Sequence, residues 1–271
     1  MSALPRSWLF TPGSRPDRFD KAAATEAGAL ILDLEDAVAE HDKAEARGHV
    51  VAYLGRQPTP QNLTVRINPL SCATGMEDLV AFARLERGPD MLLMPKSEEP
   101  AELALAARVL EDAGSKALLV ALVETARGIA RAHELATATP RLAALMFGAA
   151  DYAANLGQQV GVFQTDFAKA SLVNAAAVGG IAAIDSPFFA IDRPDDLAAE
   201  SRRSRGLGFF AKAAIHPSQI GPINAAFAPT TAEHDLALRI LKAAPSGVGV
   251  LDGKMVDVAM IRWARRVAAP A

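Results

Sequence analysis

Short apolar runs bounded by turn residues recur along the whole chain. Most of these runs are apolar on both faces, a pattern typical of strands buried between two layers in a parallel sheet. The eight runs are Ser7–Thr11, Ala29–Leu34, Leu63–Asn68, Met91–Pro95, Ala117–Glu124, Leu142–Gly148, Ile181–Asp185 and Ala211–His216.

The segments between these runs have helical periodicity, with acidic residues near their starts and glycine at several of their ends. The expected helices are Pro16–Ala27, Asp42–Leu54, Glu98–Ala113, Arg127–Thr137, Gln164–Val178 and Pro194–Arg205. Eight strand-then-helix units predict a (β/α)₈ TIM barrel. A doubly wound open sheet is the alternative, but no GxGxxG motif follows the first run.

The pattern changes after the eighth run. The expected elements there are a last barrel helix over His216–Phe227, a break at Ala228–Thr231, a helix over Thr231–Lys242, a glycine-rich hairpin over Ser246–Met255 and a helix over Val256–Val267. This tail is longer than a barrel needs. We therefore expect a TIM-barrel catalytic domain over residues 1–228 and a C-terminal helical extension over 229–271 that packs on a neighbouring subunit.

Composition narrows the class of protein. The 271 residues are 51% hydrophobic and carry a formal net charge of −3, which indicates a globular chain with no general attraction to nucleic acid or anionic membranes. A single cysteine, Cys72, excludes an internal disulfide framework and a cysteine-based zinc cage. No apolar window is long enough to span a membrane, and the first residues lack a signal-peptide core. We expect a cytoplasmic protein.

Polar residues follow most of the expected strands, at the end of a TIM barrel where active sites lie. Glu124 and Asp151 follow two consecutive strands. Because neighbouring strands lie about 4.8 Å apart, these carboxylates can share one small hard cation, and Mg²⁺ typically takes one or two protein carboxylates. Alternatively, each carboxylate caps the helix that follows it. The residues alone leave both interpretations open.

Arg66 lies near the end of the third expected strand, Leu63–Asn68, and Glu35 and Asp36 follow the second. A guanidinium at the barrel mouth can bind a carboxylate or stabilise a developing enolate. It can also form a buried ion pair with Glu35 or Asp36. The two roles are compatible, because a neighbouring acid can orient the arginine that binds the substrate.

Three further residues carry weaker signals. Lys96 follows the fourth expected strand and is either a Schiff-base lysine or, as we favour, a counter-ion of the acidic residues at the mouth. His216 is a candidate general base. Cys72 lies in an expected loop after Pro69 and is a weak candidate nucleophile. Zinc deaminase, α/β-hydrolase and Walker A motifs are absent.

Several motifs, in order and over almost the whole chain, resemble the citrate lyase β-subunit family within the wider HpcH/HpaI aldolase and malyl-CoA lyase group. They are Arg6–Gly13, Leu32–Val38, Val65–Asn68, Met94–Lys96, Glu124–Gly128, Phe147–Tyr152 and Lys212–Pro217. The resemblance implies a TIM barrel, a Mg²⁺ ion and retro-Claisen cleavage of a 3-hydroxyacyl-CoA thioester such as malyl-, citramalyl- or citryl-CoA into acetyl-CoA and a small 2-oxo acid.

The family's metal carboxylates fall on Glu124 and Asp151, and its substrate arginine falls on Arg66. Gly253–Asp257 resembles the C-terminal segment of malyl-CoA and citramalyl-CoA lyases, in which the aspartate reaches a neighbouring subunit's active site. The resemblance thus implies that Asp257 protonates the enolate, within a homotrimer or a dimer of trimers. Alternatively, Asp257 caps the last helix.

Other residues complete the expected site. Glu35 and Asp36 support catalysis by holding metal-bound water or Arg66. Lys96 joins the substrate-binding residues, and Arg15 and Arg18 meet the phosphates of coenzyme A or start a solvated helix. Three alternative functions remain open: a malyl-CoA thioesterase, a non-catalytic β subunit of a citrate lyase-type complex, and an aldolase for free 2-keto-3-deoxy acids, which leaves the tail unexplained.

Overall fold

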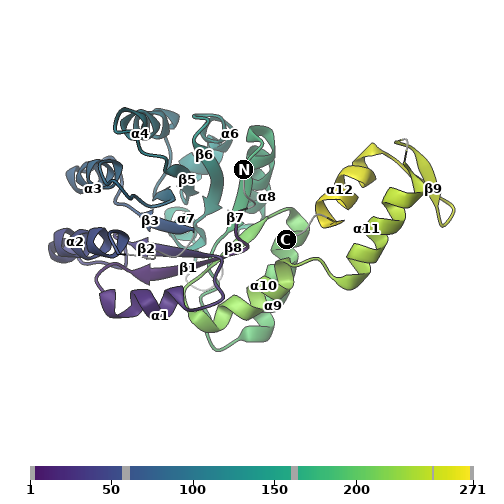
Figure 1. Ribbon diagram of the computed structural model, residues 1–271, viewed down its shortest axis with the longest axis horizontal. Helices are drawn as coiled ribbons and strands as arrows, with labels where there is room; N and C mark the ends of the chain where they lie inside the picture. Colours follow the sequence, from purple (N-terminus) through teal and green to yellow (C-terminus); the bar gives the residue numbers. More distant parts are fainter. Residues whose placement is uncertain (1–3, 57–61, 160–163, 246, 269–271) are drawn as a thin grey trace. The chain divides into compact units, whose positions relative to one another are not determined.

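The computed structural model describes residues 4–56, 62–159, 164–245 and 247–268 (Figure 1). The described residues divide into two compact units, residues 4–227 and residues 228–268. Over these ranges, no helix combines the length and the apolar character needed to cross a membrane.

The first unit is built on eight parallel strands that close into a barrel in sequence order, with β8 paired to β1. The strands are β1 (Ser7–Pro12), β2 (Ala29–Asp33), β3 (Leu63–Arg66), β4 (Met91–Met94), β5 (Leu118–Val123), β6 (Leu142–Phe147), β7 (Ala182–Asp185) and β8 (Ala211–Ala214). The predicted TIM barrel is confirmed, and each strand overlaps one of the eight apolar runs.

Strand β5 shows why these runs are apolar on both faces. Val120 and Leu122 pack inside the barrel with Trp8 and Met146. The alternate residues of the same strand, including Leu119, pack outward with the residues of the surrounding helices. A strand that contacts apolar groups on both sides has no solvent-facing positions, so polar alternation is lost.

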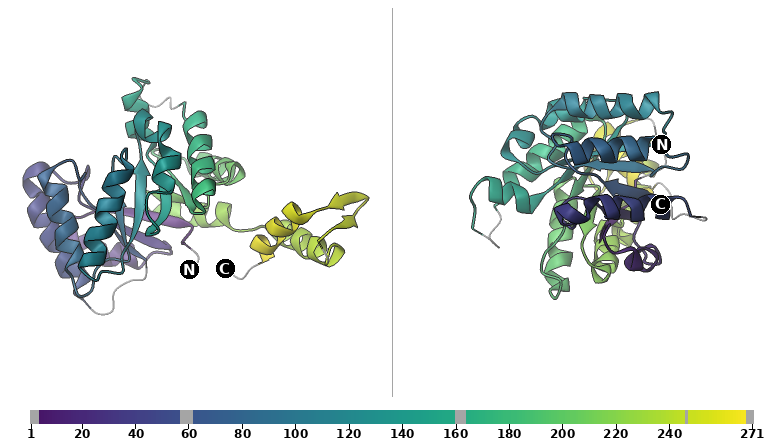
Figure 2. Two further views of the ribbon diagram at one scale, coloured as in Figure 1. Left: turned by 90° about the horizontal axis from the view of Figure 1, so that it is seen from above. Right: turned by 90° about the vertical axis from the view of Figure 1, so that its left-hand side faces the viewer.

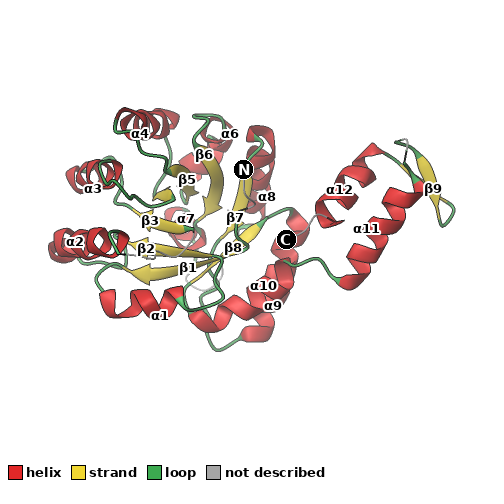
Figure 3. Cartoon of the chain, viewed as in Figure 1, coloured by secondary structure: helices red, strands yellow, loops and turns green. Residues whose placement is uncertain are grey.

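Helices surround the strands, as the red and yellow elements in Figure 3 show. In this unit they are α1 (Phe19–Ala23), α2 (Lys43–Leu54), α3 (Ala73–Ala83), α4 (Pro100–Asp112), α5 (Ala126–Ala130), α6 (Ala132–Ala136), α7 (Ala149–Asn155), α8 (Asp166–Gly179), α9 (Pro194–Leu207) and α10 (Ile220–Phe227). Short 3₁₀ turns at Pro16–Arg18, Glu40–Asp42 and Pro217–Gln219 precede α1, α2 and α10. Figure 2 shows the same elements from two further directions.

The helices depart from expectation in three places. Helix α3 was not expected, because its first turn contains Thr74 and Gly75, which are poor helix formers. The single helix expected over Arg127–Thr137 is two short helices that meet at Arg131, where the backbone leaves the helical conformation. Helix α7, which contains Asp151, was not among the expected helices.

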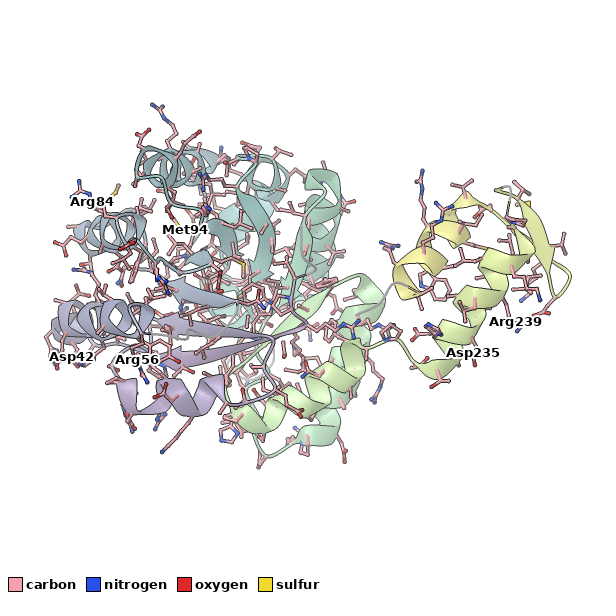
Figure 4. All side chains as sticks on the ribbon, in the orientation of Figure 1. Asp42, Arg56, Arg84, Met94, Asp235 and Arg239 are labelled. Carbon is pink, nitrogen blue, oxygen red and sulfur yellow. The ribbon has the colours of Figure 1, made fainter. Side chains whose placement is uncertain are left out.

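The second unit contains α11 (Thr231–Ala243), a hairpin of β9 (Gly249–Leu251) and β10 (Lys254–Val256), and α12 (Val258–Ala268). The hairpin turns at Asp252 and Gly253, both with positive φ. Its small core contains Ala237, Ile240, Ala244, Val256, Ile261, Ala264 and Val267. Figure 4 labels Arg239 on α11, whose guanidinium pairs with Asp252 of the hairpin turn. Packing of this unit on a neighbouring subunit stays a prediction.

Candidate functional site

A cavity of about 380 Å³ opens at the carboxyl ends of the barrel strands. Its polar lining residues are Asp33, Asp36, Arg66, Glu124 and Asp151, and its apolar ones include Phe10, Leu122, Met146, Phe147, Phe189 and Ile215. Four of the predicted site residues, Asp36, Arg66, Glu124 and Asp151, therefore line one cavity. These come from the ends of different strands, as is usual for TIM-barrel active sites.

Arg66 is held by Asp33 and Glu35. These two acids lie at and just after the end of β2, the strand that pairs with β3. The strand register places Asp33 of β2 beside Arg66 of β3. Arg66 Nε and Nη2 donate to the two Asp33 oxygens at 2.6 and 2.5 Å, and Nη1 lies 2.8 Å from Glu35 Oε2. Burial lowers the pKa of Arg66, but the Asp33 carboxylate outweighs it, so the pKa is raised and the group stays charged. The guanidinium is both fixed and cationic.

Asp33 is a site residue that sequence reasoning did not single out. It is the last residue of β2 and is buried. The signal that would have found it is the register of two neighbouring parallel strands, which aligns Asp33 with Arg66.

Glu35 is buried between two cations, Arg66 and Lys96, whose Nζ donates to Glu35 Oε1 at 2.8 Å. Burial raises the pKa of Glu35 in spite of these partners. Lys43 fixes the segment from the other side, since its Nζ donates to the carbonyls of Leu34 and Glu35.

Asp36 is half exposed and lies 3.7 Å from Arg66 Nη1 and 3.8 Å from Lys96 Nζ. Its position at the cavity wall leaves it within reach of solvent. The two adjacent acids thus have different surroundings: Glu35 supports the cations, and Asp36 meets the open cavity.

Lys96 follows β4 in a left-handed conformation, with φ of 48°. Partial burial lowers its pKa, but the hydrogen bond to Glu35 outweighs that effect and the pKa is raised. A Schiff-base lysine needs a lowered pKa, so this geometry favours the counter-ion role. Substrate binding by Lys96 stays a prediction.

Glu124 follows β5 directly and is only 2% exposed. Its Oε1 accepts a hydrogen bond from the Lys96 backbone N–H at 2.8 Å. Burial, followed by the charges of Glu35 and Asp151, raises the pKa of Glu124 to about 8. A carboxylate that is this poorly neutralised by the protein is suited to a cation from outside.

Asp151 lies in the first turn of α7, four positions beyond the end of β6, and lines the cavity with Glu124. Asp151 therefore lies at the barrel mouth although it belongs to a helix. Over the described parts of the chain, no cluster of three or more histidine, cysteine or acidic ligands forms. Two carboxylates nevertheless fit Mg²⁺, which keeps its other positions for water and substrate oxygens.

The remaining candidates lie elsewhere. Arg15 is exposed and makes two hydrogen bonds to Asp17, at 2.9 and 2.8 Å. Asp257 belongs to the second unit and accepts a hydrogen bond from Met260 N at 3.0 Å, as a helix cap does. His216 caps the turn before α10, and Cys72 is exposed at the start of α3. Arg15, His216 and Cys72 do not line the cavity.

Residues 6–217 match the HpcH/HpaI aldolase/citrate lyase family model. The chain belongs to this family of lyase-type enzymes, which confirms the resemblance and the expectation of an enzyme. It is 35% identical to the L-malyl-CoA/beta-methylmalyl-CoA lyase of Cereibacter sphaeroides, over 96% of this chain and 92% of the relative.

Two further relatives cover nearly the whole chain. A (3S)-malyl-CoA thioesterase of Cereibacter sphaeroides is 35% identical, over 98% of this chain and 94% of its own length. Among solved structures, CitE of Mycobacterium tuberculosis in complex with magnesium, acetoacetate and coenzyme A is similar, with 33% identity, a TM-score of 0.83 and 99% of both chains covered.

Proposed function

We propose that this protein is a Mg²⁺-dependent carbon–carbon lyase that cleaves, or forms, a 3-hydroxyacyl-CoA thioester of the malyl type. The products of cleavage are acetyl-CoA and a small 2-oxo acid. The observation that carries the proposal is the cavity in which the poorly neutralised carboxylate of Glu124 faces the same space as Asp151 and the fixed guanidinium of Arg66. The curated lyase relative and the magnesium-bound neighbour support it.

Glu124 and Asp151 are the residues that would hold the metal. When bound there, Mg²⁺ supplies Lewis-acid polarisation of the substrate's oxygen atoms. The two carboxylates also set where the polar end of the substrate lies, because a chelating hydroxy acid must approach the same cation.

Arg66 stabilises the thioester oxygen. In the cleavage direction the substrate hydroxyl gives up its proton to water and its oxygen becomes the carbonyl of the 2-oxo acid as the carbon–carbon bond breaks. The electron pair of that bond moves onto the acetyl carbon, and the negative charge spreads to the thioester oxygen. A guanidinium has five N–H donors; the two hydrogen bonds to Asp33 use two of them, and Nη1 lies at ion-pair distance from Glu35. The donors left over act without reorganisation, because Asp33 and Glu35 have already fixed the group.

Asp257 protonates the acetyl carbon, or removes its proton in the condensation direction. The residue comes from a neighbouring subunit of a homotrimer or a dimer of trimers. The exposed apolar side chains of its hairpin, Val250 and Met255 among them, support this arrangement, since they are available to contact another chain. Arg15 and Arg18 contact the phosphates of coenzyme A.

Mixing two inactive variants tests the shared site. Asp257→Ala and Asp151→Asn subunits, once mass spectrometry shows that they exchange, should recover part of the activity because one interface then pairs an intact barrel with an intact tail. Exchange without recovery would place Asp257 in its own chain's site or outside catalysis.

A malyl-CoA thioesterase is the second candidate, favoured by the 35% identity to such an enzyme over nearly the whole chain. Incubation with malyl-CoA and Mg²⁺ separates the two. Acetyl-CoA with glyoxylate is the expected result for a lyase, whereas free CoA with malate would establish the thioesterase. If neither pair of products formed, both proposals would be contradicted for malyl-CoA. The next candidates would then be citramalyl-CoA or citryl-CoA as substrate, or a role as a subunit of a larger complex.

A further inference from the structure

We propose that Gly148 and Lys96 are positioning residues that fix the Glu124 carboxylate from two sides for Mg²⁺. This inference rests on the proposed metal role of Glu124. Neither residue provides a side-chain ligand. Gly148 leaves space for the Glu124 side chain because it has no Cβ, and Lys96 holds the carboxylate with its backbone N–H.

Gly148 lies directly against Glu124, because the two residues follow the paired ends of β6 and β5. A Cβ at position 148 would lie 2.5 Å from Glu124 Cβ and 2.6 Å from Glu124 Oε2. The backbone of Gly148, with φ of −109° and ψ of 92°, is open to any residue. Glycine is therefore required here by the space that Glu124 occupies and not by the backbone conformation.

Lys96 holds the other carboxylate oxygen. Its N–H donates to Glu124 Oε1 at 2.8 Å, and its φ of 48° places it in the left-handed region. Such a conformation costs a non-glycine residue about 1–2 kcal/mol. Elsewhere in the described residues, positive φ falls on Asn62, Asp252 and glycines, which tolerate it. An unfavourable conformation of a lysine beside a candidate ligand is the kind of strain that functional sites retain.

The glycine also links the two candidate ligands. Gly148 is the N-cap of α7, and its carbonyl accepts the hydrogen bond from Tyr152 N in the turn that carries Asp151. A side chain at position 148 would therefore displace Glu124 relative to the start of that helix. Because a metal site depends on the relative placement of its ligands, a small displacement weakens binding without removing a ligand.

Calorimetric titration of the full-length, metal-free protein with MgCl₂ tests the glycine. Gly148→Ala should weaken Mg²⁺ binding by about 10- to 100-fold, as loss of ligand orientation typically does. Gly206→Ala is the matched control, since a Cβ at that helical position meets nothing within 4 Å. Its Mg²⁺ affinity should equal that of the wild type. Equal affinities of both variants, with both folded by circular dichroism, would overturn the role of Gly148.

Two substitutions of Lys96 separate its backbone from its ammonium. Lys96→Gly and Lys96→Val both remove the charge, but glycine adopts the left-handed conformation readily and valine strongly resists it. Lys96→Gly should bind Mg²⁺ within about threefold of the wild type, and Lys96→Val about tenfold more weakly. Equal affinities of the pair would overturn the backbone role. The pair also decides the inference if Gly148→Ala fails to fold.

The results that would contradict the proposed function differ from those that would contradict this inference. A wild-type protein that binds no Mg²⁺, or a Glu124→Gln variant that binds it normally, would remove the metal role of Glu124 itself. A wild type that binds and a Glu124→Gln variant that does not, combined with indifferent Gly148 and Lys96 variants, would overturn only the positioning inference.

Discussion

Glu124 and Asp185 are both buried carboxylates at strand ends of one barrel, yet the protein shifts their pKa values in opposite directions. Burial would raise the pKa of either group. For Asp185, the Lys212 and Lys169 ammonium groups outweigh burial and lower the pKa to about 2. For Glu124, burial and two neighbouring acids act together and raise it to about 8.

Asp185 belongs to a cluster of four charged residues in the barrel wall, called the wall cluster below: Asp185, Glu200, Lys169 and Lys212. Lys212 Nζ lies 2.7 Å from Asp185 Oδ2 and 2.7 Å from Glu200 Oε1, and Lys169 Nζ lies 3.0 Å from Asp185 Oδ1. These partners come from β8, α8 and α9. Two acids meet two cations, so the cluster is neutral and joins the barrel wall to its helices.

The mouth cluster consists of Asp33, Glu35, Asp36, Glu124 and Asp151 with Arg66 and Lys96. Its five acids exceed its two cations. Among the described residues Glu124 accepts a hydrogen bond from a backbone N–H and from no cationic side chain, and burial together with Glu35 and Asp151 raises its pKa. Burying unneutralised charge costs free energy. The comparison teaches that charge at a strand end does not mark a site by itself. A buried acid that faces a cavity, and whose ionised form the protein disfavours, is the better candidate.

The largest effect is expected from Asp151→Asn, which removes one of the excess acids. Loss of metal stabilisation worth several kcal/mol should lower kcat/KM by roughly 10³-fold. Steady-state assay with Mg²⁺ and malyl-CoA measures the loss. The Tm without metal should not fall, because no cation loses a partner. A fully active variant would show that activity does not need Asp151 and would contradict the assignment of the mouth cluster as a metal site.

Asp185→Asn should act on stability. Removing one partner of a buried ion pair typically costs about 3–5 kcal/mol, because Lys212 and Lys169 would then lack their shared carboxylate. Urea unfolding measures the free-energy change, and Mg²⁺ affinity of the folded variant should be unaltered. A stable variant with weakened Mg²⁺ binding would mean that the wall cluster belongs to the site.

Arg66→Lys should lower kcat by roughly 10²- to 10³-fold. Lysine keeps the charge but loses the planar fork that binds Asp33 through two nitrogens. Separate measurement of kcat and KM is the check. A raised KM with normal kcat would assign Arg66 to uniform substrate binding and not to the transition state.

The pH dependence of stability provides a smaller and more specific effect. Because the folded pKa of Asp185 is depressed from 3.8 to about 2, its contribution is complete above pH 3.8 and is lost as pH falls toward 2. The stability difference between wild type and Asp185→Asn should narrow by about 2 kcal/mol over this interval. Urea midpoints at several acidic pH values give the difference. A constant difference would show that Asp185 is not stabilised as an anion.

The barrel was predictable because its strands are apolar on both faces and each pairs with the next strand along the chain. The mouth residues Arg66, Glu124 and Glu35 were predictable because they lie at the end of a strand or within two residues after it. The same argument would also include Asp185, the last residue of β7, although its side chain meets α8 and α9. In a strand, successive side chains point to opposite faces, so a residue at a strand end faces the cavity or the helices according to register. The role of Asp33 also depends on register, which the apolar pattern alone does not specify.

Thermal unfolding of Glu124→Gln and Asp185→Asn, each with and without Mg²⁺, compares the two clusters most directly. Without metal at pH 7, Glu124→Gln should melt at or above the wild-type Tm, because a pKa raised from 4.5 to about 8 means that folding costs free energy to protonate this carboxyl, and glutamine removes that cost while keeping an oxygen for the Lys96 N–H. Mg²⁺ should raise the Tm of wild type and Asp185→Asn but not of Glu124→Gln. If Glu124→Gln instead melts well below the wild type, as Asp185→Asn should, or still responds to Mg²⁺ as the wild type does, the mouth cluster is not a cation site.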